Sequence, residues 1–312
     1  MRVVVALGGN ALSPAGGTGS ATELRTALAA AAVPLAELVG AGAALLLTHG
    51  NGPQIGRLLI QQEAAALEVP PMPMDVCGAA TQGQLGYLLA EALGAALRRR
   101  GLRQQVLPLV TQVIVDPADP AFAAPTKPVG PTYDVAVAKA MAAGSGHAFG
   151  EVRPGRWRRL VPSPRPAGFV EAEPIRLLAG SGHVLVAAGG GGVPVVPRPG
   201  GGYRGVEAVI DKDRTAAALG LLVGAEVLAI LTEVSQVQLG FGTPAARSVP
   251  KLSVSEARGL LAAGEFPAGS MGPKVEACCD FVTAGGARAV IGALDQATDV
   301  VLGTAGTTIV AG

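Results

Sequence analysis

Two short apolar runs that end abruptly in glycine constrain the fold of this chain most strongly. Residues Arg2–Leu7 are mostly β-branched and stop at Gly8–Asn10, and residues Ala43–Thr48 stop at His49–Gly52. A continuous apolar run of this length, bounded by turn residues, is typical of a strand buried on both faces. We therefore predict two central strands of a parallel sheet, with both glycine turns at its carboxyl edge.

Helical signals follow both turns, and strands and helices then alternate along the chain. Ser20–Glu23 has the capping-box pattern, which predicts the start of an Ala/Leu-rich helix that runs to about Gly40. Pro34 predicts a kink in this helix. After the second turn, Pro53 favours the start of another helix. Further helices are expected at 78–99, after 211, after 253 and at 272–284, and further strands at 105–115, 183–188, 226–231 and near 289 and 308. This order predicts an α/β fold: an open, mostly parallel β-sheet sandwiched by helices, with ligands at the carboxyl ends of the strands.

The alternation stops between Asp116 and about Pro166. Prolines, glycines and a basic segment around Trp157 interrupt every regular period there. We predict that this excursion forms a small protruding subdomain that acts as a lid.

Charge and cysteine content exclude several classes of protein. The formal net charge is +1 and basic residues are scattered among acidic ones, so we expect no nucleic-acid partner. The three cysteines are odd in number and lack metal-ligand spacing, which favours reduced thiols in a cytoplasmic protein, and we assign no residue as a metal ligand. No segment has the length or apolarity of a membrane span, so no membrane association is expected.

The glycine turns can bind an anion through their backbone. Without a Cβ, backbone N–H groups can approach an oxyanion closely, and two such turns at one sheet edge strengthen this interpretation. A simple tight turn is the alternative for either one, and no lysine follows at P-loop spacing. His49 could be a catalytic base, or a neutral histidine hydrogen-bonded at a strand end.

Lysine is rare in this chain, and three of the five lysines lie in dense motif segments: Lys127, Lys212 and Lys274. Where most cations are arginine, a retained lysine suggests a need for a compact, rotatable charge, which suits a migrating phosphoryl group. An ordinary exposed loop lysine is an equally good interpretation of Lys127, and placement near a helix N-terminus explains Asp211 or Asp213 but not Lys212 between them. Together, cations and backbone donors without a nucleophilic triad predict direct phosphoryl transfer.

Short motifs spaced along nearly the whole chain carry a family resemblance. They are Ala6–Leu12, Thr48–Gln54, Asp75–Gly78, Asp119–Phe122, Pro125–Pro128, Val161–Pro164, Gly205–Asp213 and Gly269–Lys274. Through them the chain resembles the carbamate kinases, a family of the amino acid kinase fold group. The resemblance implies reversible transfer between ATP plus carbamate and ADP plus carbamoyl phosphate, with Mg²⁺ accompanying the nucleotide, in arginine catabolism.

The resemblance also assigns roles to individual residues. The transferred phosphoryl group and carbamate would be held by Gly8, Gly9, Asn10, Gly50, Asn51 and Gly52. Lys127 would cover them, Lys212 and Lys274 would neutralise phosphate charge, and Asp213 would orient these lysines. Nucleotide contacts are expected from Asp211, Lys212, Thr232, Glu233, Met271, Gly272 and Lys274, although Glu233 stands where the family usually has aspartate.

The resemblance implies that the chain has two parts and that its partner is a second copy of itself. Residues 1–205, including the subdomain at 116–166, would bind carbamate or carbamoyl phosphate, residues 206–312 would bind nucleotide, and the protein would be a homodimer. Two alternatives stay open: another acyl-phosphate kinase such as an acetylglutamate kinase, against which Ala6 argues because those relatives carry lysine there, and a catalytically silent regulatory protein on the same fold.

Overall fold

The computed structural model describes residues 1–12, 17–267 and 269–312. Its centre is an eight-stranded sheet with the strand order β15-β17-β16-β12-β1-β2-β9-β3, in which only β16 and β17 run antiparallel to each other. The strands are β1 (Arg2–Leu7), β2 (Ala44–His49), β3 (Val106–Leu109), β9 (Val184–Ala187), β12 (Val227–Thr232), β15 (Lys251–Ser253), β16 (Arg288–Ala293) and β17 (Thr307–Val310). The two predicted glycine-terminated strands, β1 and β2, are adjacent near the middle of the sheet.

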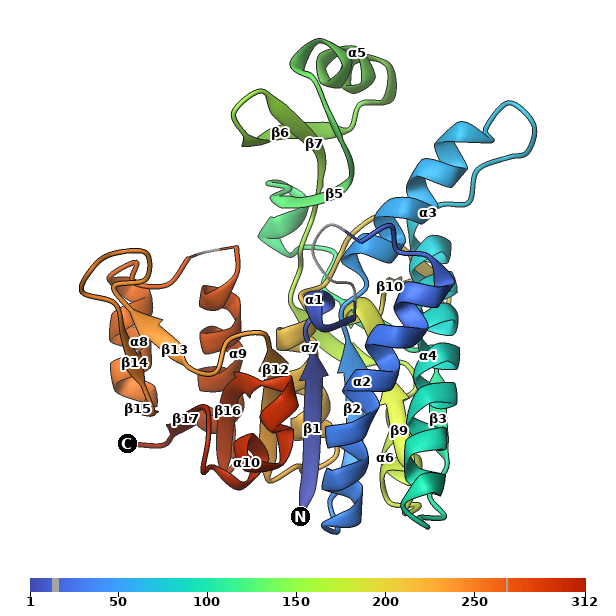
Figure 1. Cartoon of the computed structure of the whole chain (residues 1–312). Helices are drawn as coiled ribbons and strands as arrows, with labels where there is room; N and C mark the ends of the chain where they lie inside the picture. Colours follow the sequence, from blue (N-terminus) through green and yellow to red (C-terminus); the bar gives the residue numbers. More distant parts are fainter. Residues whose placement is uncertain (13–16, 268) are drawn as a thin grey trace.

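Helices cover both faces of this sheet, as Figure 1 shows. One face carries α2 (Ala21–Gly40), α4 (Met74–Arg99) and α10 (Ala297–Leu302), and the other carries α6 (Ala172–Ala179), α7 (Lys212–Leu222), α8 (Val254–Ala262) and α9 (Met271–Thr283). Alternate side chains of β1 enter the two cores: Val4 and Ala6 pack on one side, and Val3, Val5 and Leu7 on the other. The predicted fold class, an open and mostly parallel sheet between helices, is confirmed.

The predicted helix starts are largely correct. Ser20 accepts a hydrogen bond from the Glu23 amide at the start of α2, and Ser253 and Glu256 form a complete capping box at the start of α8. Helix α4 begins four residues before its predicted start, and α2 continues through Pro34 as one helix. The chain is completed by α1 (Gly9–Leu12), α3 (Gly52–Ala64), the hairpin of β13 (Val237–Leu239) and β14 (Arg247–Val249), and the short helices η2 (Gly189–Gly191) and η3 (Leu294–Gln296).

Residues of the predicted excursion form a separate small layer. Strands β5 (Lys127–Tyr133), β7 (Arg156–Val161) and β6 (Ala148–Arg153) make an antiparallel sheet beneath α5 (Val135–Ser145). Figure 1 shows this unit standing above the carboxyl edge of the main sheet. It therefore protrudes over the side on which the glycine turns lie.

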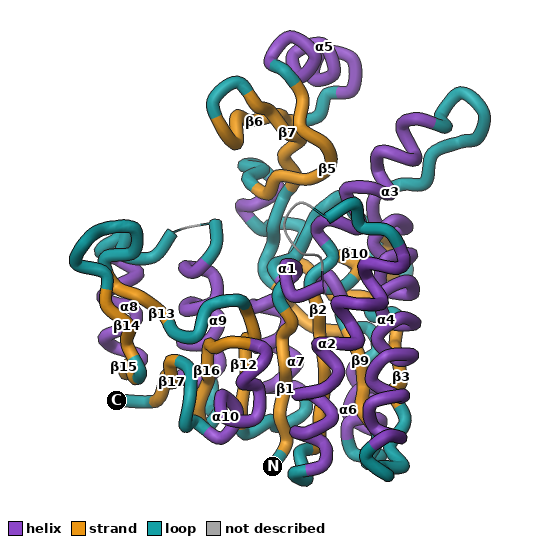
Figure 2. The backbone as a smooth tube through the Cα atoms, in the orientation of Figure 1, coloured by secondary structure: helices purple, strands orange, loops and turns teal. Residues whose placement is uncertain are grey.

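The prediction of one strand over residues 105–115 is wrong. The strand is interrupted at Val110-Thr111, and β4 (Gln112–Val115) joins a second sheet, of order β11-β10-β4-β8. Its other strands are β8 (Pro166–Phe169), β10 (Val193–Pro197) and β11 (Tyr203–Gly205). Strand β10 of this sheet is labelled in Figure 2. The Gln82 side chain holds the break: its Oε1 accepts from the Thr111 amide at 3.0 Å, and its Nε2 donates to the Thr111 carbonyl at 3.2 Å.

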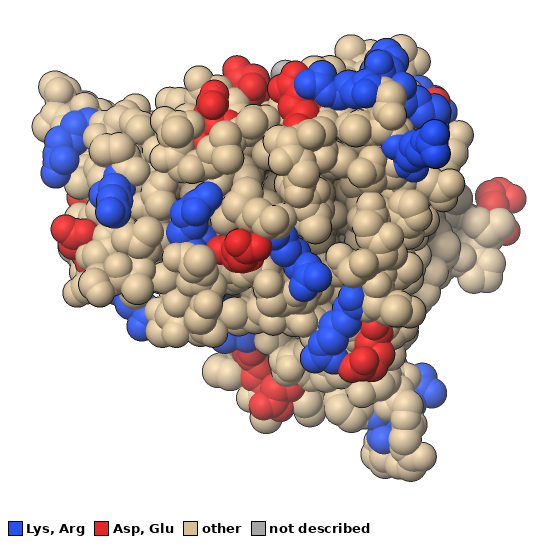
Figure 3. Space-filling view, turned by 90° about the horizontal axis from the view of Figure 1, so that it is seen from below, with Lys and Arg blue, Asp and Glu red and all other residues tan. Residues whose placement is uncertain are grey.

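Charged residues of both signs are distributed over the face of the molecule shown in Figure 3. This agrees with the net charge of +1. Within the described ranges, no helix is both long and apolar enough to cross a membrane.

Candidate active site

A cavity of about 390 Å³ lies where four neighbouring strands of the main sheet end. Residues that follow β1, β2 and β9 and the end of β12 line it: Gly8, Gly9, Gly50, Asn51, Gly52, Gly190, Thr232 and Glu233. The first residue of β5 and the N-terminal turns of α7 and α9 complete the wall: Lys127, Asp211, Lys212, Asp213, Ser270 and Lys274. The structure therefore brings most of the predicted site residues together in one place.

In each of the two glycine turns, the amide of the first glycine is already hydrogen-bonded within the sheet. The Gly8 amide donates to the Leu231 carbonyl at 2.9 Å, and the Gly50 amide donates to the Leu7 carbonyl at 3.0 Å. These two N–H groups continue the hydrogen bonding of the sheet. Gly8 and Gly50 therefore line the cavity, but their amides are not available to donate to a ligand. Anion-binding donors must come instead from the first turns of α1 and α3, at Gly9 and Gly52, because first-turn amides have no partner within their helix.

Glycine is required at position 50 by the closeness of the two turns. A Cβ on Gly50 would lie 3.0 Å from both the backbone nitrogen and the Cα of Gly9, and 3.6 Å from Cδ of Lys212. At Gly9 itself, a Cβ would meet no protein atom within 4 Å, so that side is open.

We expect Gly50→Ala to reduce kcat/KM about tenfold or more for the phosphoryl transfer that the resemblance implies, because the added methyl pushes apart groups that must hold the substrate. Gly83→Ala is the matched control, since a Cβ on Gly83 in α4 meets nothing within 4 Å. Steady-state kinetics of both variants test this, and equal kcat/KM values for the two would contradict it.

Two lysines share one buried carboxylate on the floor of the cavity. Asp213, 3% exposed, accepts hydrogen bonds from Lys212 through one oxygen and from Lys274 through the other, the latter at 2.9 Å. Asp213 lies in the first turn of α7 and Lys274 in that of α9, so the carboxylate joins the two helix N-termini. Asp213 thus lies between the two lysines that it is predicted to orient, and the orienting role itself stays a prediction.

Lys127 reaches the same cavity from the protruding subdomain. Its Nζ lies 3.0 Å from Oδ2 of Asp211, whose other oxygen caps α7 by accepting from the Asp213 amide at 3.0 Å. Asp211 is therefore a helix cap as well as the partner of Lys127.

Burial and neighbouring charges act in opposite directions on these groups. Burial raises the pKa of Asp211, but the ammonium groups of Lys127 and Lys212 outweigh it and bring that pKa to about 2. Burial lowers the pKa of Lys212 despite the Asp213 carboxylate. For Lys274, burial also lowers the pKa, but Asp213 more than compensates and the net shift is upward. Lys274 thus holds its positive charge more firmly than Lys212 does.

His49 is a structural residue in this arrangement. It is 1% exposed, its Nδ1 lies 3.0 Å from the Gly50 carbonyl, and its ring packs where a Cβ of Gly189 would be. Burial lowers the pKa of His49 to about 4. It does not line the cavity, so the catalytic-base alternative is not supported.

Because His49 is buried, we expect the folded protein to lose stability in acid at pH values above those at which carboxylates titrate. The unfolded chain takes up a proton at His49 below pH 6.5, whereas the folded chain does so only near pH 4. The contribution of the neutral His49 to the free energy of unfolding should therefore be fully present above pH 6.5. Between pH 6.5 and 4 the free energy of unfolding should fall by up to about 3 kcal/mol. Urea unfolding of the wild type and His49→Gln at several pH values tests this, and equal slopes against pH in the two proteins would contradict it.

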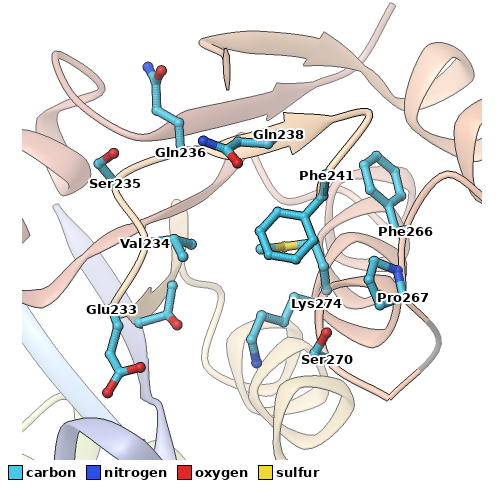
Figure 4. Close-up of a pocket in the computed structure, with 12 residues that line it drawn as sticks. Glu233, Val234, Ser235, Gln236, Gln238, Phe241, Phe266, Pro267, Ser270 and Lys274 are labelled. Atoms are coloured by element: carbon cyan, nitrogen blue, oxygen red, sulfur yellow. The ribbon is translucent and has the colours of Figure 1, made fainter. Parts of the chain in front are cut away.

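A second pocket, of about 400 Å³, adjoins the cavity and shares Thr232, Glu233, Ser270 and Lys274 with it. Figure 4 shows Phe241 and Phe266 on one side of this pocket and Val234 and Glu233 on the other. Apolar side chains facing a few polar ones, at a cavity lined by lysines, suit a nucleoside whose phosphates enter that cavity.

Three predicted site residues need separate mention. Met271 lines only the second pocket. Gly272 lines neither: it is buried against the loop, where its amide donates to the Pro267 carbonyl at 3.0 Å. Asn10 lies in α1, and its side chain falls outside the described residues.

Sequence reasoning missed Gly190 and Ser270 as lining residues. Gly190 has a φ of +70°, and a Cβ there would lie 2.2 Å from the side-chain Nδ2 of Asn51. This Nδ2 donates a hydrogen bond to the Thr81 hydroxyl at 2.8 Å. The signal was the run Gly189–Gly192 directly after a strand, a third glycine turn at the same sheet edge.

Asp211 and Asp213 are the two aspartates of the cavity that could contact a metal arriving with a nucleotide. In the described part of the chain, no group of three or more His, Cys, Asp or Glu residues could hold a metal ion. Asp211 and Asp213 line the cavity but are already paired with lysines. Mg²⁺ commonly keeps water and phosphate oxygens as ligands, which fits such a site.

Comparison with known proteins gives consistent matches over the whole chain. The model of the amino acid kinase family matches residues 1–293. A carbamate kinase of Pyrococcus furiosus is 45% identical over 310 residues, covering 99% of this chain and 98% of that protein, and one of Trichomonas vaginalis is 43% identical, covering 99% of both. The solved structure of carbamate kinase from Giardia lamblia bound to AMP-PNP is 38% identical, with a TM-score of 0.92 over 100% of this chain and 98% of that one.

Proposed function

The chain belongs to the amino acid kinase family, and from that premise we propose that it is a carbamate kinase. It transfers a phosphoryl group reversibly between ATP plus carbamate and ADP plus carbamoyl phosphate, and it makes ATP in arginine catabolism. The observation that carries the proposal is the convergence of Lys127, Lys212 and Lys274 on one cavity between the glycine turns and the adjoining apolar pocket.

The reaction needs positive charge more than it needs a base. Carbamate is an anion whose oxygen can attack phosphorus directly, so the barrier lies in bringing two negative groups together. In the direction of ATP formation, a β-phosphate oxygen of ADP attacks the phosphorus of carbamoyl phosphate, and the bond from phosphorus to the carbamate oxygen breaks. Fixed cations lower this barrier because they are already oriented when charge moves between the two oxygens.

Each lysine has a distinct place in this scheme. Lys212, held by Asp213 on the cavity floor, contacts the moving phosphoryl group. Lys274, on the side shared with the apolar pocket, contacts the β-phosphate. Lys127 is 39% exposed and covers the carbamoyl side from above. When ligand phosphates enter, they compete with Asp211 and Asp213 for these ammonium groups.

The two halves of the chain divide the substrates between them. Residues 1–205 supply the glycine turns and Lys127 and bind carbamate or carbamoyl phosphate, with residues 116–166 acting as a lid. Residues 206–312 supply Lys212, Lys274 and the apolar pocket and bind the nucleotide, including contacts from Asp211, Thr232, Glu233 and Met271. A nucleotide would bring Mg²⁺ with it, and the ion would neutralise phosphate charge in the cavity lined by Asp211 and Asp213.

We also propose that the protein works as a cytoplasmic homodimer. Exposed apolar side chains on the outer helices support an interface: Val33 of α2 is 48% exposed and Tyr87 of α4 is 60% exposed. Light scattering would then give a mass of about twice 30.9 kDa, and a monomer mass would contradict the proposal.

The direct test is ATP formation from ADP and carbamoyl phosphate with Mg²⁺, with an enzyme-free control for the breakdown of carbamoyl phosphate. Rapid ADP-dependent production of ATP is expected. No production from carbamoyl phosphate, together with ATP-dependent phosphorylation of acetylglutamate or a related acid, would show another acyl-phosphate kinase. Nucleotide binding without any turnover would indicate a silent regulatory protein.

A further inference from the structure

The three lysines of the cavity are carried by three separate elements. Lys127 begins β5 at the base of the protruding subdomain, Lys212 begins α7, and Lys274 lies in the first turn of α9. Phosphoryl transfer of the kind proposed requires that the three ammonium groups keep fixed positions relative to one another, because misplacement of about 1 Å can cost about 100-fold in rate. Something must therefore hold the three elements in register.

Glu276 joins two of these elements directly. It lies on α9, two residues after Lys274, and its Oε2 accepts a hydrogen bond at 2.8 Å from Arg214 of α7. Arg214 in turn follows Asp213, the carboxylate that holds Lys212 and Lys274. Among the described residues, Glu276 is the only carboxylate paired with Arg214.

The other oxygen of Glu276 reaches the base of the protruding subdomain. Oε1 accepts from Arg165 at 2.5 Å, and the same guanidinium donates to Asp280, one turn further along α9, at 3.2 Å. The Arg165 amide donates to Asp119 at 2.9 Å, and Asp119 also caps the short helix η1 (Pro120–Phe122). Asp119 therefore ties together the two chain segments that enter and leave the subdomain.

Arg165 is close in the chain to the strand partner of Lys127. Val161 pairs with Lys127 between β7 and β5, and the next carbonyl, of Pro162, accepts from the Val209 amide at 2.9 Å. Val209 leads into Asp211 and Lys212. The segment 161–165 thus connects the Lys127 strand both to the start of α7 and, through Arg165, to α9.

We propose that Glu276 is a positioning residue for the proposed phosphoryl transfer, holding α7, α9 and the base of the protruding subdomain in register through Arg214 and Arg165. It lines neither the cavity nor the adjoining pocket, so it acts through the residues it holds. This inference rests on the proposed function, and it also gives a role to the motifs Asp119–Phe122 and Val161–Pro164, which the site does not otherwise use.

An ordinary surface ion pair is the competing explanation. The side chain of Arg165 is 58% exposed, and exposed pairs contribute little to stability. Glu276 and Arg214 are more enclosed, with side chains 30% and 24% exposed, and Glu276 bridges two arginines from different elements. The two explanations differ in what they predict for turnover, which a solvated pair would leave unchanged.

The test compares steady-state ATP formation by the wild type, Glu276→Gln, Arg165→Gln and the double variant, using the full chain with ADP, carbamoyl phosphate and Mg²⁺. Glu276→Gln keeps the shape of the side chain and removes its charge. We expect kcat to fall about 10- to 100-fold because the lysines are misplaced. The KM for ADP should change by less than about threefold. Because both changes break the same link, the double variant should have a kcat close to that of Glu276→Gln alone.

Glu91→Gln is the control for loss of a solvated ion pair, since Glu91 and its partner Arg25 are each 48% exposed and lie on the helices of the other sheet face. Wild-type kcat in both Glu276→Gln and Arg165→Gln would overturn the inference, as would multiplicative effects in the double variant. If Glu276→Gln does not fold, the test rests on Arg165→Gln. The inference then requires that the kcat of Arg165→Gln be at least severalfold lower than that of the wild type. An inactive wild type would instead refute the proposed function and this inference with it.

Discussion

Lys274→Ala is expected to lower kcat for ATP formation roughly 10²- to 10³-fold or more while the protein stays folded. Preorganised groups that meet developing charge contribute this much each when removed singly. Lys274 is the lysine whose pKa is raised on balance, because the Asp213 carboxylate outweighs its burial, and it lines both the cavity and the adjoining pocket. The fold should survive because Asp213 keeps Lys212 as its partner.

The control for this prediction comes from the lysines outside the site. Lys251 on β15 and Lys139 on α5 are exposed and line neither the cavity nor the pocket, so Lys251→Ala and Lys139→Ala should keep wild-type kcat. Circular dichroism and a thermal melt establish that each variant is folded. A folded Lys274→Ala protein with kcat within a few-fold of the wild type would contradict the assigned role.

Asp213→Asn is expected to have the largest combined effect on stability and turnover. The carboxylate sits between two ammonium groups whose side chains are only 13% and 17% exposed, so its removal leaves two enclosed cations facing each other. Removing one partner from a buried pair typically costs about 3–5 kcal/mol. We expect a loss of about 3 kcal/mol in the free energy of unfolding and at least a hundredfold fall in kcat.

Asp134→Asn provides the comparison for stability. Asp134 pairs with Arg156 in the protruding subdomain, but the two side chains are 76% and 56% exposed, so its loss should cost no more than about 1 kcal/mol. Urea unfolding at neutral pH measures both variants. The buried-carboxylate argument would be wrong if Asp213→Asn were destabilised no more than Asp134→Asn.

The sequence predicted the part of the fold that local chemistry specifies. Arg2–Leu7 and the run at Ala43–Thr48 are apolar on both faces, so only a central strand can bury them, and the glycines that follow mark where each strand ends. Two helix starts were predictable from Ser20 and Ser253, because the hydroxyl of each capping serine accepts a hydrogen bond from the backbone amide three positions later.

The rarity of lysine was the most useful signal for the site. All three lysines singled out from their motifs lie at the cavity, and Lys139 and Lys251 are both exposed. The argument worked because arginine serves most other cationic positions in this chain, so each lysine was informative.

Features that depend on distant contacts were not predictable. The break at Thr111 is fixed by Gln82, and the Thr111 hydroxyl also accepts from the Ala188 amide at 3.0 Å, across 77 positions of sequence. Thr111 and Gln112 interrupt the apolar run at this point, but the sequence does not show which distant residues they contact. For the same reason the loss of free amides at Gly8 and Gly50, which bond to neighbouring strands, could not be seen from the turns alone.

The position of β1 has a consequence for how the protein is made. Strand β1 is a central strand, flanked by β2 on one edge and by β12 on the other, and it leaves the ribosome long before β12 does. Val3 pairs with Val227, so at about 5–20 residues per second that second edge waits roughly 11 to 45 s for its partner. During this time a β-branched, uncharged run has an open edge, which is the kind of segment that associates with other chains. Slow release of the C-terminal third, rather than instability of the finished protein, is therefore the step at which aggregation is most easily provoked.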